Sequence, residues 1–217
     1  MNWGVILEVA IGALISVVFV VWMEEVRKPA LVLRIEDPVD DTWVGRPANR
    51  GRFLCIVCTN RSLPWYAKWL SRDTALRCYG FVTFCHLDGQ DIFGRQMPII
   101  WSNHPAVRLF PYGRTEAYPY EFVKHVDIHG GYGEALTALV RLDDDPECYG
   151  WCYDSYFSEP LWRNANWRLE QGRFLVKVEV ISAGARGVGL FRLVNDVPVN
   201  AFRLENAHPD DYRKIFH

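Results

Sequence analysis

The chain has 217 residues, of which 50% are hydrophobic and 14% aromatic, and its formal net charge is −2. This apolar fraction is enough to bury a substantial core, so the composition excludes a disordered protein. The 24 basic and 26 acidic residues are scattered along the chain. Because nucleic-acid binders concentrate Lys and Arg on one face, nucleic acid is not an expected partner.

The first element is an apolar segment, Gly4 to Trp22, in which Glu8 is the only charged residue. Its nineteen residues, at a rise of about 1.5 Å each, match the hydrocarbon core of a bilayer. Trp3 and Trp22 bracket the segment, and amphipathic indoles favour the two membrane interfaces. We therefore predict one N-terminal transmembrane helix in contact with a lipid bilayer, rather than a cleaved signal peptide or a buried core helix.

Basic residues lie on one side of this segment only. No Lys or Arg precedes it, whereas Arg27 and Lys28 follow it. Because Lys and Arg favour the cytoplasmic side, we predict a single-pass protein with its N-terminus outside and residues 29–217 in the cytoplasm. Residues 1–28 then form the anchor and a short juxtamembrane segment. The expected membrane-interface residues are Trp3, Trp22, Arg27 and Lys28.

After Pro29 the chain places apolar residues at every second position, which is typical of half-buried strands. In the segment Ala30–Glu36, for example, Leu31, Leu33 and Ile35 fall on one face. The other predicted strands are Arg52–Thr59, Arg77–Leu87, Met97–Ser102, Lys124–His129, Glu134–Leu142, Arg173–Ile181, Val188–Asn195 and Val197–Leu204.

Glycine-rich turns separate several of these strands. Gly130–Gly133 predicts a hairpin between the strands on either side of it, and Ser182–Gly187 predicts another. Strands at this density predict that residues 29–217 form a single all-β domain, an immunoglobulin-like antiparallel β-sandwich preceded by the transmembrane helix. The further expected features are long loops at Tyr112–Tyr120 and Glu147–Asn166, a helical turn within Leu63–Asp73 and a short C-terminal helix at His208–Phe216.

The chain has six cysteines, and two of them form a Cys-x-x-Cys pair, Cys55 and Cys58. On a strand, residues three apart point to opposite faces, so these two sulfurs are expected to diverge into a core rather than to bind zinc. A cytoplasmic location also discourages disulfides. The alternative is an extracytoplasmic recognition domain in which the cysteines are bridged.

A second candidate site is His125-x-Asp127-x-His129, whose three side chains share one face of a predicted strand. Such a row can hold a divalent metal, which makes a membrane-tethered metal-binding protein or metalloenzyme the second alternative. A fourth ligand is not identifiable, so a solvent-facing row is the favoured interpretation. No cofactor is expected.

Catalytic motifs do not emerge from the sequence. It has no G-x-S-x-G nucleophile turn, and the glycines of Gly184–Gly189 lack the Lys-Ser/Thr ending of a phosphate loop. We therefore assign no catalytic residues, and an enzyme is the less favoured class.

Aromatic residues gather in two segments, 63–73 and 147–167. We expect most of these rings to be buried, whereas exposed rings would bind protein, peptide or lipid headgroups. The candidate interaction residues are Trp65, Trp69, Trp151, Trp162 and Trp167. The predicted function is an interaction, scaffolding or recognition role at the cytoplasmic membrane face, with another protein as partner.

Overall fold

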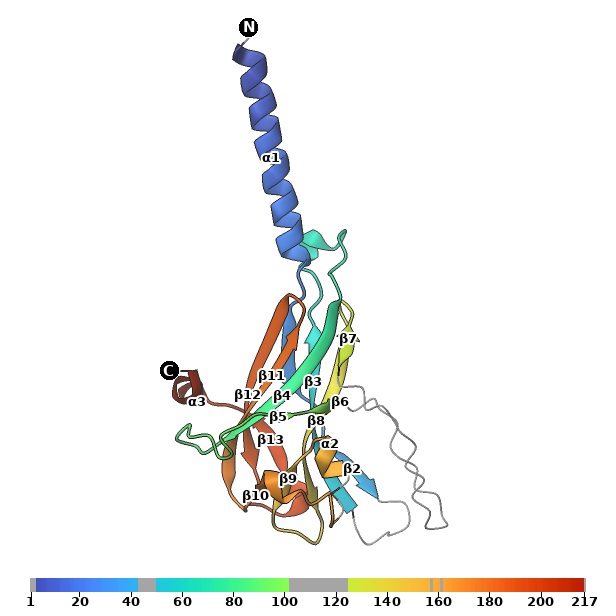
Figure 1. The fold of residues 1–217 in the computed structure, drawn as a ribbon, viewed down its shortest axis with the longest axis vertical. Helices are drawn as coiled ribbons and strands as arrows, with labels where there is room; N and C mark the ends of the chain where they lie inside the picture. Colours follow the sequence, from blue (N-terminus) through green and yellow to red (C-terminus); the bar gives the residue numbers. More distant parts are fainter. Residues whose placement is uncertain (1–2, 43–49, 102–124, 157, 161, 217) are drawn as a thin grey trace.

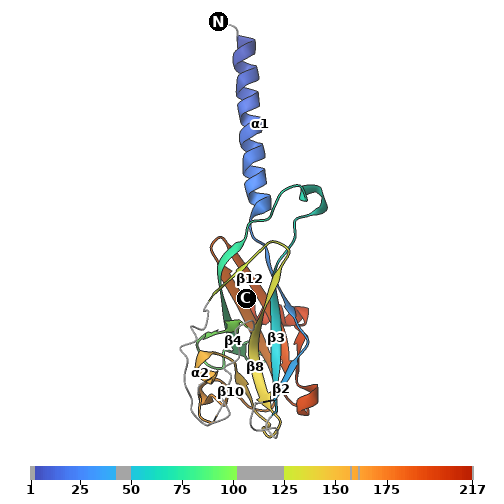
Figure 2. The same cartoon turned by 90° about the vertical axis from the view of Figure 1, so that its right-hand side faces the viewer.

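A single helix, α1 (Trp3–Arg27), stands out from one end of a body built of two antiparallel β-sheets (Figures 1 and 2). The computed structural model describes residues 3–42, 50–101, 125–156, 158–160 and 162–216. Strands account for 43% of the residues that the structure describes. The prediction of a mostly β protein behind one N-terminal apolar helix is therefore confirmed, and the predicted loop Tyr112–Tyr120 lies outside the described residues.

One sheet has seven strands and the other has six. The seven-stranded sheet runs β1 (Leu31–Ile35), β3 (Arg50–Asn60), β8 (Gly133–Leu142), β9 (Cys148–Gly150) and β10 (Arg168–Leu169), with β2 (Val39–Thr42) paired to β3 and β6 (Ile100–Trp101) paired to β8. The six-stranded sheet runs β13 (Arg203–Asn206), β12 (Ala185–Val194), β11 (Arg173–Ser182), β4 (Ala75–Cys85) and β5 (Met97–Pro98), with β7 (Val126–Ile128) paired to β4.

Most predicted strands lie where the alternating pattern puts them, and β11 and β12 form the expected hairpin. The hairpin predicted across Gly130–Gly133 is wrong. β7 pairs with β4 in one sheet, whereas β8 pairs with β3 in the other. Alternation reports that a segment is a strand with one buried face, but it does not report which strand is its neighbour. Similarly, the predicted strand Val197–Leu204 begins as a 3-10 turn, η3 (Val199–Ala201), and becomes β13 only at Arg203.

The main core lies between the two sheets. On β11 the alternate residues Phe174, Val176, Val178 and Val180 all point into it, as the sequence pattern predicts. Their partners from the facing sheet include Leu54, Ile56 and Cys58 of β3 and Leu136 of β8. Because both inner faces are continuous and apolar, burial of this layer accounts for the pairing of the sheets as a sandwich.

The sheets approach each other most closely where β1 passes β12, and glycine permits this approach. A Cβ atom at Gly187 would lie 2.8 Å from the Leu31 Cβ, and one at Gly189 would lie 3.0 Å from the Leu33 Cβ. Any larger residue would push the strands apart. Since β1 follows α1 directly, this contact and the β1–β3 pairing connect the helix to both sheets.

Helix α3 (Pro209–Phe216) covers part of the outer face of the six-stranded sheet, which confirms the predicted C-terminal helix. Ile215 packs against buried Leu175 and Leu190 of that sheet. The fully buried Asp211 carboxylate accepts hydrogen bonds from the Arg192 guanidinium at 2.6 and 2.9 Å and from the backbone N–H of His208 at 2.9 Å. The hydrogen bonds from Arg192 are the main reason that the pKa of Asp211 lies below its usual range.

Replacing Asp211 by Asn keeps the side-chain volume but removes the charge that Arg192 binds. We expect Asp211→Asn to lower the free energy of unfolding at pH 7 by about 1–3 kcal/mol, measured by denaturant titration in detergent. The neighbouring Asp210→Asn is the matched control, because the Asp210 side chain is 64% exposed. Stability from a carboxylate with a depressed pKa is present above its unfolded pKa of about 4 and is lost as the pH falls further, so parent and variant should converge in acid. Equal stability of Asp211→Asn and the parent at pH 7 would contradict this role.

Candidate functional site

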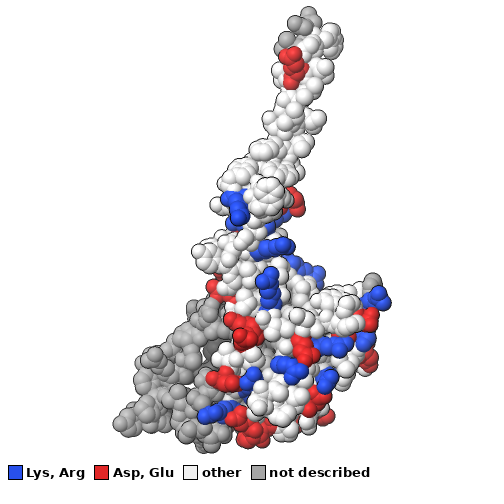
Figure 3. Space-filling view, turned by 180° about the vertical axis from the view of Figure 1, so that it is seen from behind, with Lys and Arg blue, Asp and Glu red and all other residues white. Residues whose placement is uncertain are grey.

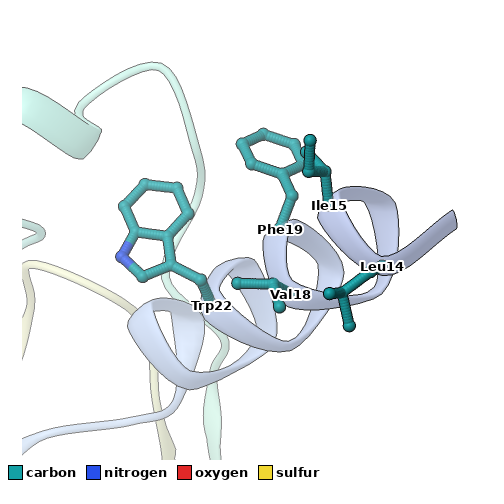
Figure 4. Close-up of a pocket in the computed structure, with 5 residues that line it drawn as sticks. All are labelled: Leu14, Ile15, Val18, Phe19 and Trp22. Atoms are coloured by element: carbon teal, nitrogen blue, oxygen red, sulfur yellow. The ribbon is translucent and has the colours of Figure 1, made fainter. Parts of the chain in front are cut away.

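Helix α1 is long and apolar enough to span a membrane over Leu7–Arg27, and its most apolar stretch has no buried residue. Its surface between the two ends is nearly free of charge (Figure 3). A shallow depression on one side of the helix is lined by Leu14, Ile15, Val18, Phe19 and Trp22 (Figure 4). The helix therefore presents hydrocarbon in all directions.

The exposed apolar surface of α1 has a definite energetic consequence. Ten Leu, Ile, Val and Phe side chains between Leu7 and Val21 are exposed. Transfer of such side chains to the middle of a bilayer is favourable by about 0.3–0.6 kcal/mol each, or about 3–6 kcal/mol for the set. A free-standing helix in water gains none of this energy, so the geometry of α1 suits lipid.

The C-terminal end of α1 is bonded to the loop between β3 and β4. The Asp73 backbone N–H donates to the Arg27 carbonyl at 2.9 Å. The Arg27 guanidinium donates to the Asp73 carboxylate at 2.8 Å and to the Ser71 carbonyl at 3.2 Å, and the Arg72 guanidinium donates to the Lys28 carbonyl. These bonds supply partners for carbonyls at the helix end, which the helix itself leaves unpaired.

Two loops at this end of the body carry exposed rings. The loop after β3 contains the 3-10 turn η1 (Trp65–Ala67), where Trp65 is 81%, Tyr66 53% and Trp69 65% exposed. In the turn between β7 and β8, Tyr132 is 70% exposed, and its carbonyl accepts the Asn60 N–H at 3.0 Å. Outside α1, these are the four most exposed aromatic side chains among the described residues.

Basic residues lie among these rings. Arg61 and Lys68 are exposed on the same loop as half-buried Arg72. Desolvation, followed by repulsion from Arg61, lowers the pKa of Arg72, while the nearby Asp73 carboxylate acts in the opposite direction. Lys and Arg side chains gather where α1 meets the body (Figure 3). We call this region the helix-proximal surface; it comprises Trp65, Tyr66, Trp69, Tyr132, Arg61, Lys68 and Arg72.

The other three candidate tryptophans lie elsewhere and are covered. Trp151 and Trp167 are only 9% and 5% exposed, and Trp162 is half-buried. Trp151, Trp162 and Phe53 pack edge to face, with ring centroids 5.0–5.7 Å apart, over the outer face of the seven-stranded sheet. Trp151 belongs to this outer-face cluster and Trp162 packs against it, whereas Trp167 packs in the main core, so these rings offer less binding surface than Trp65 and Trp69.

Asp127 lies on β7, with His125 and His129 directly before and after the strand, and each of the three side chains contacts a residue on or beside β4. The His125 ring lies 5.3 Å from the Tyr79 ring, the Asp127 carboxylate accepts the Arg77 N–H at 2.7 Å, and His129 Nδ1 bonds the Thr74 hydroxyl at 2.9 Å. Asp127 thereby supports the irregular register of β4 at Arg77, whose φ is 52°. Among the described residues no group of three or more His, Cys, Asp and Glu side chains is placed to share a metal ion.

Comparison with known proteins gives no match to this chain among family models, curated proteins or solved structures. The functional inference therefore rests on the chemistry of α1 and of the helix-proximal surface beside it. Amphipathic rings and cations beside an apolar helix suit a boundary between water and an apolar phase. Sequence reasoning identified Trp65 and Trp69 but missed Tyr132, because only the fold brings the two loops together. It also did not single out Arg61, Lys68 and Arg72, although they lie on the same loop as the two tryptophans.

All six cysteines are buried, and none of them is in a disulfide. Cys58 points into the main core and Cys55 into the cluster on the opposite face of the sheet, so the two thiols diverge as predicted. Burial is the largest cause that raises the pKa of Cys58 to about 12 and that of Cys78 to about 11. At neutral pH such groups hold almost no thiolate, which is the reactive form.

We therefore expect the six thiols of the folded, full-length protein in detergent to stay unmodified by a thiol-reactive chromophore at pH 8. Unfolding without reductant should make all six thiols react, which corresponds to six equivalents of released chromophore per chain. Tyr66→Cys is the control, because its exposed thiol should add one fast equivalent. Fast reaction of the parent, or fewer than six thiols after unfolding, would contradict the structure. In the latter case the interacting thiols Cys58 and Cys78 are the first pair to examine for a bridge.

Proposed function

We propose that this chain is a single-pass membrane protein whose helix α1 crosses the bilayer and holds the β body at the cytoplasmic face, where the body binds another protein. The observation that carries the proposal is α1 itself, which is apolar on all sides, uncovered by the body and hydrogen-bonded to it at one end. An uncovered apolar helix that ends in a fixed attachment suits an anchor rather than a core element.

The distribution of charge supports the cytoplasmic placement of the body. Arg27 and Lys28 follow the helix in sequence, and no Lys or Arg precedes it. The fold adds Arg61, Lys68 and Arg72 at the same end. Basic residues favour the cytoplasmic side, where anionic lipids attract them.

The six buried cysteines, none of which is in a disulfide, are a second support, because a reducing compartment keeps thiols unbridged. We also propose that the two facing antiparallel sheets belong to the immunoglobulin-like class of sandwiches. Its support is the shared core between the two inner faces.

Exposed apolar side chains on the six-stranded sheet support the proposal of a protein partner. On its outer side, Tyr79, Ile181 and Val188 are exposed around the ion pair between Glu179 and Arg186. These residues lie toward the end of the sheet that is near α1. The adjoining β11–β12 turn is at that end, where the Ala183 N–H donates to the carbonyl of Leu76 at the start of β4. A partner that uses this apolar face must itself lie near the membrane surface.

The partner proposal predicts which substitution abolishes binding. Val188→Lys places a cation opposite Glu179, so the cross-strand pair keeps the strand stable while the apolar face is lost. We expect a protein that co-purifies with the parent after extraction of membranes in mild detergent to be lost from Val188→Lys. It should remain with Val39→Lys, because Val39 is 52% exposed on the other sheet. Unchanged recovery with Val188→Lys, or no co-purifying protein with the parent, would overturn the proposal.

A further inference from the structure

We propose that the helix-proximal surface is a second membrane contact: its rings and its free cations enter the headgroup layer of the leaflet that α1 leaves, so the body is held against the bilayer in one orientation. The inference rests on the proposed function, since it requires α1 to lie in a bilayer. Its ligand is the lipid interface, and specifically the anionic headgroups within that interface.

The depth of this surface follows from its attachment to α1. Trp22 marks the expected hydrocarbon boundary, and the five residues from there to Arg27 rise by about 7 Å along the helix. The headgroup layer on each side of a bilayer is about 5–8 Å thick. The loop that is hydrogen-bonded to Arg27 therefore starts at the level of the headgroups. Both views place the segment around residue 65, coloured teal, beside the last turn of α1 (Figures 1 and 2).

Two backbone hydrogen bonds close the turn that displays the rings. The Ala67 N–H donates to the Pro64 carbonyl at 3.0 Å, and the Leu70 N–H donates to the Ala67 carbonyl at 2.9 Å. Ala67 is fully buried beneath the turn, while Trp65 and Trp69 point outward and remain exposed. Internal bonding of the backbone matters at this depth, because an unpaired amide is costly where water is scarce.

The charges at this level complete the match with anionic lipid. Arg27 is paired with Asp73, and Lys28 with Glu25. No ion pair of Arg61 or Lys68 occurs with any residue that the structure describes. Arg72 Nε is buried and has no hydrogen-bond partner among the described atoms. Exposed Glu24 offsets one of these charges, which leaves a net positive surface toward the lipid phosphates.

A bilayer fits this surface better than a protein does, because the rings lie beside the last turn of a helix whose apolar side chains are exposed. Indole and phenol rings place a flat apolar body in lipid and a polar atom in water, and Lys and Arg extend their charge to phosphate. Rings and cations alternate over one short loop, which is the composition that a headgroup layer accommodates. A protein groove would require a contiguous apolar patch with the cations at its rim.

The test measures the depth of residue 66 in the full-length protein, reconstituted in phosphatidylcholine bilayers that contain phosphatidylglycerol. A nitroxide is attached to Tyr66→Cys and, in a matched sample, to Val39→Cys, since the parent side chains are 53% and 52% exposed. Native cysteines are buried and stay unlabelled. We expect the label at 66 to lose accessibility to an aqueous nickel chelate and to keep accessibility to oxygen, whereas the label at 39 stays accessible to both.

A second variant tests the cause of this protection. Changing both Trp65 and Trp69 to Ser in the Tyr66→Cys chain should return the label at 66 to water, while vesicle flotation of the protein stays unchanged. If the protein floats with the vesicles but the label at 66 matches that at 39, the second contact is wrong and the anchor stands. Failure to float would overturn both proposals. Spin–spin broadening at 66 would show that a second copy covers the surface, and would contradict a lipid contact.

Discussion

The hydrogen bonds between Arg27 and Asp73 join the last turn of α1 to the body, and the position of the body depends on this junction. The connection between the end of α1 and the first strand is short, because β1 begins at Leu31. β1 pairs with β3 in one sheet and touches β12 of the other across Gly187. Helix, loop and both sheets are thus connected within a few residues, so the placement of α1 in a bilayer also sets the height and direction of the body above it.

The composition of the protein surface changes from α1 to the far end of the body. Hydrocarbon covers α1, rings and cations cover the helix-proximal surface, and mixed polar and apolar side chains cover the sandwich. Each zone matches the medium expected at that distance from the bilayer centre. The farther aromatic segment follows a different rule, since Trp151 and Trp162 cover the outer face of β3 and stabilise the fold. Two clusters of similar composition therefore have different roles.

The sequence predicted α1, the inner face of β11 and the C-terminal helix correctly. The spacing of apolar residues and a proline at the first helical position are signals that depend only on residues within the same segment. The prediction of a β7–β8 hairpin was wrong, because strand pairing is decided by contacts between residues distant in sequence. The sequence also did not predict which rings are buried. Trp65 and Trp151 both lie in aromatic-rich segments, yet Trp65 is exposed and Trp151 is buried in the outer-face cluster. Tyr132 joined the helix-proximal surface through the fold alone.

The most direct measurement is labelling of single cysteines from the two sides of the membrane in cells that express the full-length chain. A membrane-impermeant maleimide should modify Asn2→Cys in intact cells, and should modify Val39→Cys only after the membrane is permeabilised; the parent, whose six cysteines are buried, stays unlabelled. Equal modification of the two cysteines in intact cells, or of neither until permeabilisation, would show that α1 does not cross the membrane. The reversed pattern would place the β body outside.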